Sequence, residues 1–240
     1  KYGIEVQVTR VGKYKSAVEP YISDRMSEPN REQVAKLVGD LWSHWKNTVA
    51  ADRKLTPDQL QTLADERGVL VGEEGKKAGL VDVVANYDGV LDELKKVSGK
   101  GSKDRDFPQI GLDHYAELRT EAALGTKRIA VVYAEGDIVD GEGGDGYVGG
   151  DKLSRELRKL RLDNGVKAVV LRVNSPGGSA TASELIQREV ILTRQVKPVV
   201  ISMGYLAASG GYWISTYADR IFAEPTTITG SIGVYGILPN

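Results

Sequence analysis

Apolar and polar positions in the first part of the chain predict one strand followed by helices. Ile4, Val6 and Val8 alternate with polar neighbours, a pattern typical of a half-buried strand. Between residues 34 and 49, apolar residues recur at steps of three and four, which predicts an amphipathic helix. Its start is expected within 27–32, where Ser, Glu, Pro and Asn cluster.

Three further helices are expected before residue 97. Thr56 is suited to cap a helix whose first position is Pro57. The segment 75–96 is expected to hold a helix, a strand-like stretch at 80–83 and another helix at 88–96.

The second half of the chain alternates buried strands with helices. Continuous runs of Val, Ile and Leu are separated by amphipathic segments, with strands expected at 128–133, 168–173 and 198–202 and helices at 151–162 and 183–194. Such runs are typical of parallel strands that are buried on both faces. The pattern therefore predicts an α/β fold with a parallel sheet flanked by helices.

A short polar segment divides these two parts. Residues 97–106 are small, charged and without periodicity, so we expect a linker over 98–126 between residues 1–97 and 127–240.

Of the 240 residues, 41% are hydrophobic and 27% are charged, which is a globular composition. Lys and Arg number 32 and Asp and Glu number 33, so no basic balance favours nucleic-acid binding.

The rare residue types restrict the possible chemistry. The chain has no cysteine, which excludes disulfides and thiol catalysis, and two histidines, which disfavour a histidine-rich metal site. No run approaches the ~18 apolar residues that span a bilayer.

Two glycine-rich stretches follow expected strands, where open α/β sheets place their sites. The stretch 136–150 is rich in Gly and Asp, and we favour a mobile surface loop there. The stretch 174–179, Asn-Ser-Pro-Gly-Gly-Ser, leaves backbone N–H groups uncovered and suits an anion or a developing oxyanion. Pro-Gly-Gly is also an ordinary turn, so this pattern alone is weak.

A third cluster surrounds one serine. Ser209 lies between two alanines and two glycines, so little side-chain bulk covers its hydroxyl, and the N–H of Gly210 follows it directly. A helix start that uses small residues for close packing explains the same pattern equally well. A second hydroxyl-bearing stretch follows at 226–234.

A serine nucleophile needs a base, and the local pattern does not choose one with confidence. His44 and His114 fit surface or packing positions better than a strand-end site. A lysine serves if its surroundings lower its pKa towards neutrality. Lys15 differs from the other lysines because it ends a strand-like segment in Gly-Lys-Tyr-Lys-Ser-Ala.

Several motifs together resemble one known family. The chain is similar along essentially its whole length to signal peptide peptidase A, or protease IV, a membrane-associated serine protease family of bacteria and plastids. The resemblance rests on five motifs in the family's order, at residues 14–17, 79–82, 174–179, 208–212 and 229–233.

The resemblance implies a role for each candidate residue. Ser209 matches the nucleophile, Lys15 the general base, the N–H groups of Gly178 and Gly210 the oxyanion hole, and Ser231 a hydroxyl that orients the lysine. It also implies a fold similar to the Clp protease and crotonase group, built from repeated β-β-α units, and no metal or organic cofactor.

The order of the motifs implies how the protein is organised. Short family members carry the serine before the lysine, whereas here the lysine comes first. This order matches the long form with two tandem similar domains. Residues 1–97 would be the second half of an N-terminal domain and residues 127–240 the first half of a C-terminal one.

The resemblance further implies the partners and the location. Substrates would be cleaved signal peptides and unfolded apolar segments, and the protein would form a homo-oligomer, a tetramer in the family. Membrane association would use a segment absent from this chain, at the bacterial inner membrane facing the periplasm or at the thylakoid. Nucleic acid is not an expected partner.

Three alternatives remain at this stage. A crotonase-like acyl-CoA enzyme would use the two N–H groups without needing Ser209 or Lys15, and a silent assembly scaffold would need neither. A fragment of the whole protein could also be folded yet inactive. Leu206, Ile232 and Val234 suit an apolar substrate, although we favour core positions for them.

Overall fold

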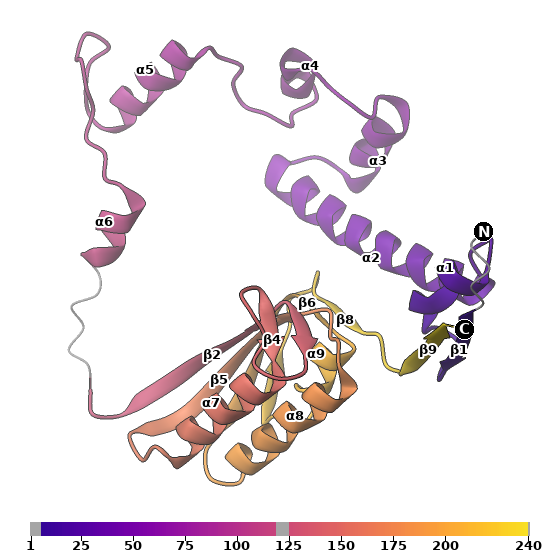
Figure 1. The fold of residues 1–240 in the computed structure, drawn as a ribbon. Coiled ribbons are helices and arrows are strands. Elements are labelled where there is room, and N and C mark those ends of the chain that lie inside the picture. Colours follow the sequence, from indigo (N-terminus) through magenta and orange to yellow (C-terminus); the bar gives the residue numbers. More distant parts are fainter. Residues whose placement is uncertain (1–5, 119–124, 240) are drawn as a thin grey trace. The chain divides into compact units, whose positions relative to one another are not determined.

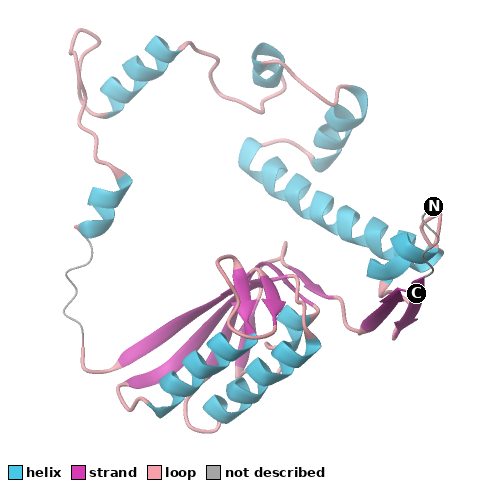
Figure 2. Cartoon of the chain, viewed as in Figure 1, coloured by secondary structure: helices cyan, strands magenta, loops and turns pink. Residues whose placement is uncertain are grey.

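The computed structural model describes residues 6–118 and 125–239 as helices and strands joined by loops (Figures 1 and 2). Up to residue 118 the elements are β1 (Val6–Arg10), the 3-10 helix η1 (Ser16–Val18), α1 (Glu19–Ile22), α2 (Glu28–Arg53), α3 (Pro57–Glu66), α4 (Gly72–Lys77), α5 (Tyr87–Val97) and α6 (Leu112–Glu117). From residue 125 they are β2 (Arg128–Glu135), β3 (Asp137–Val139), β4 (Tyr147–Gly149), α7 (Gly150–Leu162), β5 (Val166–Ser175), α8 (Ala180–Arg194), β6 (Val199–Ala208), α9 (Gly210–Trp213), β7 (Arg220–Phe222), β8 (Ile228–Gly230) and β9 (Tyr235–Pro239).

The chain forms two compact units, and their boundary falls inside α2. The first unit combines residues 1–41 with 125–240, and the second contains residues 42–124. The lysine segment and the serine segment therefore belong to one unit, although Lys15 and Ser209 lie 194 positions apart in sequence. The predicted division at 1–97, 98–126 and 127–240 concerns the domains of a longer protein and stays a prediction.

A parallel sheet is the main element of the first unit. Its strand order is β2-β5-β6-β7, and β8 pairs with the C-terminal part of β6. Every pairing in this sheet is parallel. The predicted α/β class and the parallel sheet are thus confirmed, and each expected strand and helix after residue 127 is present. A separate antiparallel pair joins β1 to β9.

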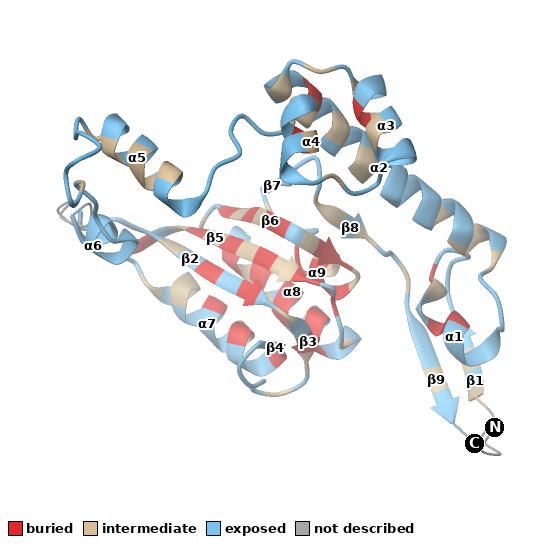
Figure 3. Cartoon of the chain, turned by 90° about the horizontal axis from the view of Figure 1, so that it is seen from above, coloured by how far each residue is buried: buried red, intermediate tan, exposed pale blue. Residues whose placement is uncertain are grey.

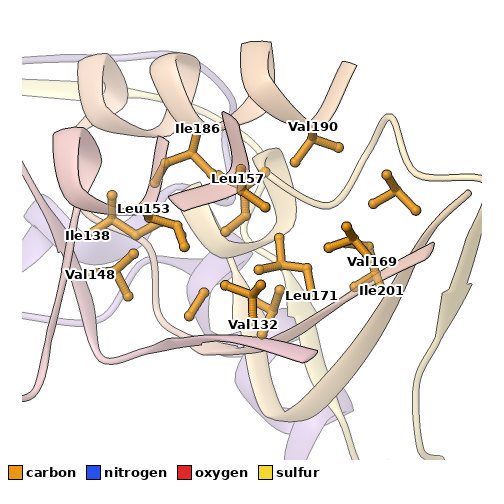
Figure 4. Close-up of a cluster of buried hydrophobic side chains, with 14 of the residues drawn as sticks. Val132, Ile138, Val148, Leu153, Leu157, Val169, Leu171, Ile186, Val190 and Ile201 are labelled. Carbon is orange, nitrogen blue, oxygen red and sulfur yellow. The ribbon is translucent and has the colours of Figure 1, made fainter. Parts of the chain in front are cut away.

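The core lies between this sheet and the helices α7 and α8. Leu153 and Leu157 of α7 and Ile186 and Val190 of α8 meet the inward side chains of the strands, such as Leu171 (Figure 4). Close packing of this kind is what gives a domain a single arrangement.

The opposite face of the sheet differs from the prediction. Within the first unit, the outward side chains of β2, namely Ile129, Val131 and Tyr133, are exposed, so α7 and α8 cover this strand on one face only (Figure 3). A continuous apolar run has apolar residues on both sides of the strand, and it does not tell which side is covered.

Other expectations are corrected in detail. The stretch 136–150 is no loose loop, because β3 and β4 pair in parallel there. Gly136 permits this pairing, since a Cβ at that position would collide with the carbonyl oxygen of Gly146. The strand-like segment 80–83 forms no strand, and α6 lies within the expected linker. Of the first predicted strand, Val6 and Val8 belong to β1, whereas Ile4 lies outside the described residues.

The long helix predicted after residues 27–32 is confirmed as α2, and Thr56 caps α3 as expected. Its hydroxyl accepts from the N–H of Gln59, whose side chain accepts from the N–H of Thr56 in return.

In the part of the chain that the structure describes, no helix is both long and apolar enough to cross a membrane.

Candidate functional site

Ser209 occupies the sharp turn between β6 and α9. Its backbone has φ +53° and ψ −117°, a conformation that residues other than glycine rarely adopt. The backbone N–H of Ser209 donates to the carbonyl of Gly230 at 2.8 Å, and its carbonyl accepts from Trp213. A strained residue persists only where its surroundings hold it, and such residues concentrate at functional sites.

Lys15 reaches this serine from the other end of the sequence. Its Nζ lies 3.1 Å from the Oγ of Ser209, 2.8 Å from the carbonyl oxygen of Ser231 and 3.0 Å from the Oγ of Ser231. Lys15 is 5% exposed, and burial lowers the pKa of its amine below the ordinary value of about 10.5. Three predicted site residues therefore meet at one point.

Ser231 holds its place through an unusual backbone conformation of its own. It follows the last residue of β8 and has φ +52°, while β8 pairs with the end of β6 just before Ser209. The same strand pairing therefore sets the positions of Ser209 and Ser231.

The glycine turn after β5 approaches Ser209 closely. A Cβ on Gly177 would collide with the backbone N of Gly210, and a Cβ on Gly210 would lie 3.2 Å from the backbone N of Gly178. Only glycine permits this approach, since Gly177 also has φ +97°. Among residues 6–118 and 125–239, neither the Gly178 nor the Gly210 N–H donates a hydrogen bond. Two free donors therefore lie beside the serine.

All these groups line one cleft of about 810 Å³. Ile232 and Val234 also line it, and Ile232 is 76% exposed, so the preference for core positions is wrong for this pair. Leu206 is half-buried in β6 and outside the cleft. Apolar side chains that remain exposed in a cleft are a feature of ligand sites.

The sequence pattern did not predict a polar network that contacts the backbone of Lys15. Glu19, at the start of α1, is buried, and its carboxylate accepts from the Ser27 hydroxyl at 2.5 Å and from the Asn30 amide at 3.0 Å. Arg10 donates both to Glu19 at 3.4 Å and to the backbone carbonyl of Lys15 at 3.3 Å. The hydrogen bonds from Ser27 lower the pKa of Glu19, so this carboxylate is charged near neutral pH.

The two histidines have no part in this cleft. His44 lies exposed on α2, and His114 lies exposed on α6, 3.6 Å from Glu117. Both belong to the second compact unit. Within the described ranges, no group of three or more His, Cys, Asp and Glu residues is arranged to hold a metal ion.

The fold and the site together define a class of protein. It is an α/β protein with a serine hydroxyl and a buried lysine amine in one cleft. The profile of peptidase family S49 matches residues 1–100 and 191–240. These ranges cover more than half of the chain, and the chain belongs to peptidase family S49.

Named relatives agree with this family. The chain is 46% identical to protease 4 of Salmonella typhi over 246 residues, which cover 99% of the chain and 40% of that protein. It is 35% identical to the chloroplastic serine protease SPPA of Arabidopsis thaliana over 242 residues, which cover 98% of the chain and 35% of that protein. The chain thus spans 40% or less of the length of these relatives.

A comparison with solved structures finds a mutant of ClpP1 from Listeria monocytogenes. The identity is 20%, the TM-score is 0.28, and the match covers 36% of this chain and 44% of that chain. A TM-score this low does not establish a shared fold. The fold class is assigned from the strand order described above.

Proposed function

We propose that this chain carries the active site of a serine endopeptidase in which Ser209 is the nucleophile and Lys15 the general base. The observation that carries the proposal is the 3.1 Å approach of the buried Lys15 amine to the Ser209 hydroxyl, beside two free backbone N–H groups. Membership of a peptidase family and the names of the relatives support the same reaction class.

The neutral form of Lys15 is suited to activate the serine. A neutral amine has two N–H donors and one lone pair, whereas the ammonium has three donors and no lone pair. If the two N–H groups donate to the carbonyl and hydroxyl of Ser231, the lone pair faces Ser209. Ser231 is then the positioning residue that aims the base.

Acylation follows from this arrangement. Lys15 takes the proton from the Ser209 hydroxyl as Oγ attacks the peptide carbonyl, and the N–H groups of Gly178 and Gly210 donate to the oxyanion that forms. One such donor typically contributes ~100- to 1000-fold in rate. When the carbon–nitrogen bond breaks, the Lys15 ammonium returns its proton to the leaving amine.

Deacylation repeats the sequence with water. Lys15 takes a proton from the water that attacks the ester, and the second tetrahedral intermediate collapses to release the acid and the free Ser209 hydroxyl. Every proton that leaves a nucleophile passes to Lys15 and then to a leaving group. The reaction as proposed needs no metal and no organic cofactor.

The substrate class and the assembly are parts of the same proposal. We infer cleaved signal peptides and other unfolded apolar segments as substrates, a choice that the exposed Ile232 and Val234 of the cleft support. The whole protein would form a homo-oligomer, a tetramer by resemblance, and would associate with the inner or thylakoid membrane. Lys15 and Ser209 would come from two tandem domains of similar fold.

A fluorophosphonate probe tests the dyad directly in the full-length protein. Labelling should occur at Ser209, increase with pH as Lys15 loses its proton, and vanish in both Ser209→Ala and Lys15→Ala. Lys13→Ala is the matched control, because Lys13 is exposed two residues away and should leave labelling unchanged.

The alternatives give different results in the same experiment. Labelling that survives Lys15→Ala would exclude Lys15 as the base. Absence of labelling in the wild type would favour the acyl-CoA enzyme or the scaffold. An acyl-CoA enzyme would in addition keep its activity in Ser209→Ala.

A further inference from the structure

Asp137 is the only carboxylate among the described residues that line the cleft. The one basic side chain in the described lining is Lys15, which is buried and turned towards the two serines. The remaining lining residues are small, hydroxyl-bearing or apolar. A single exposed acid in such a cleft gives it a negative side.

Strand β3 presents Asp137 beside the proposed oxyanion donors. The N–H of Ile138 donates to the carbonyl of Gly177 at 2.8 Å, and the N–H of Ser179 donates to the carbonyl of Ile138 at 2.8 Å. Ile138 therefore lies level with Gly178, and its side chain is buried in the core. Because side chains alternate along a strand, Asp137 faces the other way.

Two nearby acids that follow Asp137 in sequence are already engaged, whereas Asp137 is not. Asp140 accepts from the hydroxyl of Ser179 at 2.6 Å, and Glu142 forms an ion pair with Arg155. Within residues 6–118 and 125–239, the Asp137 carboxylate has no hydrogen bond and no ion pair. It is exposed and available to a molecule in the cleft.

We propose that Asp137 selects peptides that carry a lysine or arginine side chain near the bond to be cut. The inference rests on the proposed peptidase function and deepens it. A fixed negative charge near the oxyanion site opposes the negative charge that develops there. A cationic substrate side chain that pairs with Asp137 removes this opposition and adds a charge-assisted hydrogen bond.

The test compares pairs of fluorogenic peptides with the full-length protein. The two members of a pair are identical except for lysine or glutamine at one position within three residues of the scissile bond. At one position we expect kcat/KM to favour lysine by about tenfold, the factor that ~1.4 kcal/mol gives. The preference should narrow when the salt concentration is raised.

Two variants assign the preference to one side chain. Asp137→Asn should abolish the preference for lysine, and Asp137→Lys should reverse it, so that the glutamine peptide is cleaved faster than the lysine peptide. Asp145→Asn makes the same change of charge on an exposed residue between β3 and β4, outside the cleft lining, and should keep the wild-type preference.

The outcomes separate this inference from the proposed function. If Ser209 is labelled by the probe but the paired peptides are cleaved equally, the selectivity of Asp137 is overturned and the peptidase function stands. A preference that persists in Asp137→Asn overturns it as well. If Ser209 is not labelled in the wild type, the proposed function fails and this inference fails with it.

Discussion

The segment around Ser209 and the segment around Lys15 differ in what surrounds them. Ser209 follows a central strand of the sheet, whose inward side chains pack against α7 and α8 in one continuous core. In the described residues up to Leu41, by contrast, Val18 is the only buried hydrophobic side chain. Glu19 and Lys15 itself are buried beside it.

The two segments are therefore held by different forces. Apolar burial around the serine is non-directional and large, and it can sustain the strained backbone of Ser209. The lysine segment depends on directional contacts of Glu19, with Ser27, Asn30 and Arg10, and on Gln33, which donates to the Ser16 hydroxyl at 2.7 Å. Core changes should thus act mainly on stability, and changes in the polar network mainly on catalysis.

The largest effect is expected from a cavity in the core. Leu171→Ala removes a fully buried side chain of β5 and should cost about 2–5 kcal/mol of unfolding free energy. Leu37→Ala, on the lysine side, truncates a residue that is 39% exposed on α2 and should cost about 0.5 kcal/mol or less. Calorimetry of both variants measures the difference. Equal losses would show that the lysine side has a core of its own.

The next effect concerns the turn that places the proposed oxyanion donors. Gly177→Ala would put a Cβ against the backbone N of Gly210 and 2.8 Å from the Cβ of Ser209, so the donors must move. We expect kcat to fall about 100- to 1000-fold, as for the loss of an oxyanion donor. Gly144→Ala is the control, since its Cβ would meet nothing within 4 Å. A Gly177→Ala enzyme with normal kcat would contradict the assigned role of the turn.

On the lysine side, the corresponding change is Glu19→Gln. The amide would turn a donor towards the Ser27 hydroxyl, the Asn30 amide or Arg10, all of which donate to Glu19. A displacement of Lys15 of about 1 Å should lower kcat by up to about 100-fold.

Steady-state kinetics and thermal unfolding separate a positioning role from a structural one. If Glu19 positions Lys15, kcat falls while KM and Tm change little, and probe labelling of Ser209 slows in parallel. A lower Tm with normal kcat would mean that Glu19 only stabilises the fold. Glu32→Gln is the control, because within the described residues the Glu32 carboxylate accepts a hydrogen bond only from the exposed Tyr14 hydroxyl.

The same contrast explains what the sequence could predict about the fold. The strands after residue 127 are recognisable because buried parallel strands are continuous apolar runs. β3 and β4 are hidden in a glycine-rich stretch, where their pairing depends on close backbone approach. The segment 80–83 has a strand-like pattern but pairs with no strand of the described residues, and Asp82 forms an ion pair with Arg53 instead.

The candidate site was predictable to a similar, partial degree. The small residues around Ser209 are a local signal, and they marked the serine without any structure. Lys15 was identified through a family resemblance, because its burial results from contacts with residues 194 and 216 positions away. Glu19 and Asp137 had no local sequence signal. Glu19 is unusual because its carboxylate is buried, and Asp137 is unusual because its carboxylate lines the cleft without a partner among the described residues.

The smallest effect is expected at Ser231, where the two segments meet. Loss of the hydroxyl removes one of the acceptors of the Lys15 amine and leaves the backbone carbonyl of Ser231 in place. One net hydrogen bond of about 0.5–1.5 kcal/mol corresponds to a fall in the maximal rate of about two- to thirteenfold. Ser231→Gly tests this without a backbone penalty at φ +52°, and Ser231→Ala should agree with it.

The pH dependence of kcat/KM shows whether the Ser231 hydroxyl raises or lowers the pKa of Lys15. The proposed base Lys15 would act only when neutral, so activity should rise with pH through the pKa of Lys15, which burial holds below about 10.5. The Ser231 hydroxyl accepts from the ammonium and favours the charged form, so its removal should lower the pKa further. The profile of the variants should therefore shift to lower pH while its plateau falls. A shift to higher pH would mean that the hydroxyl stabilises the neutral amine more than the ammonium.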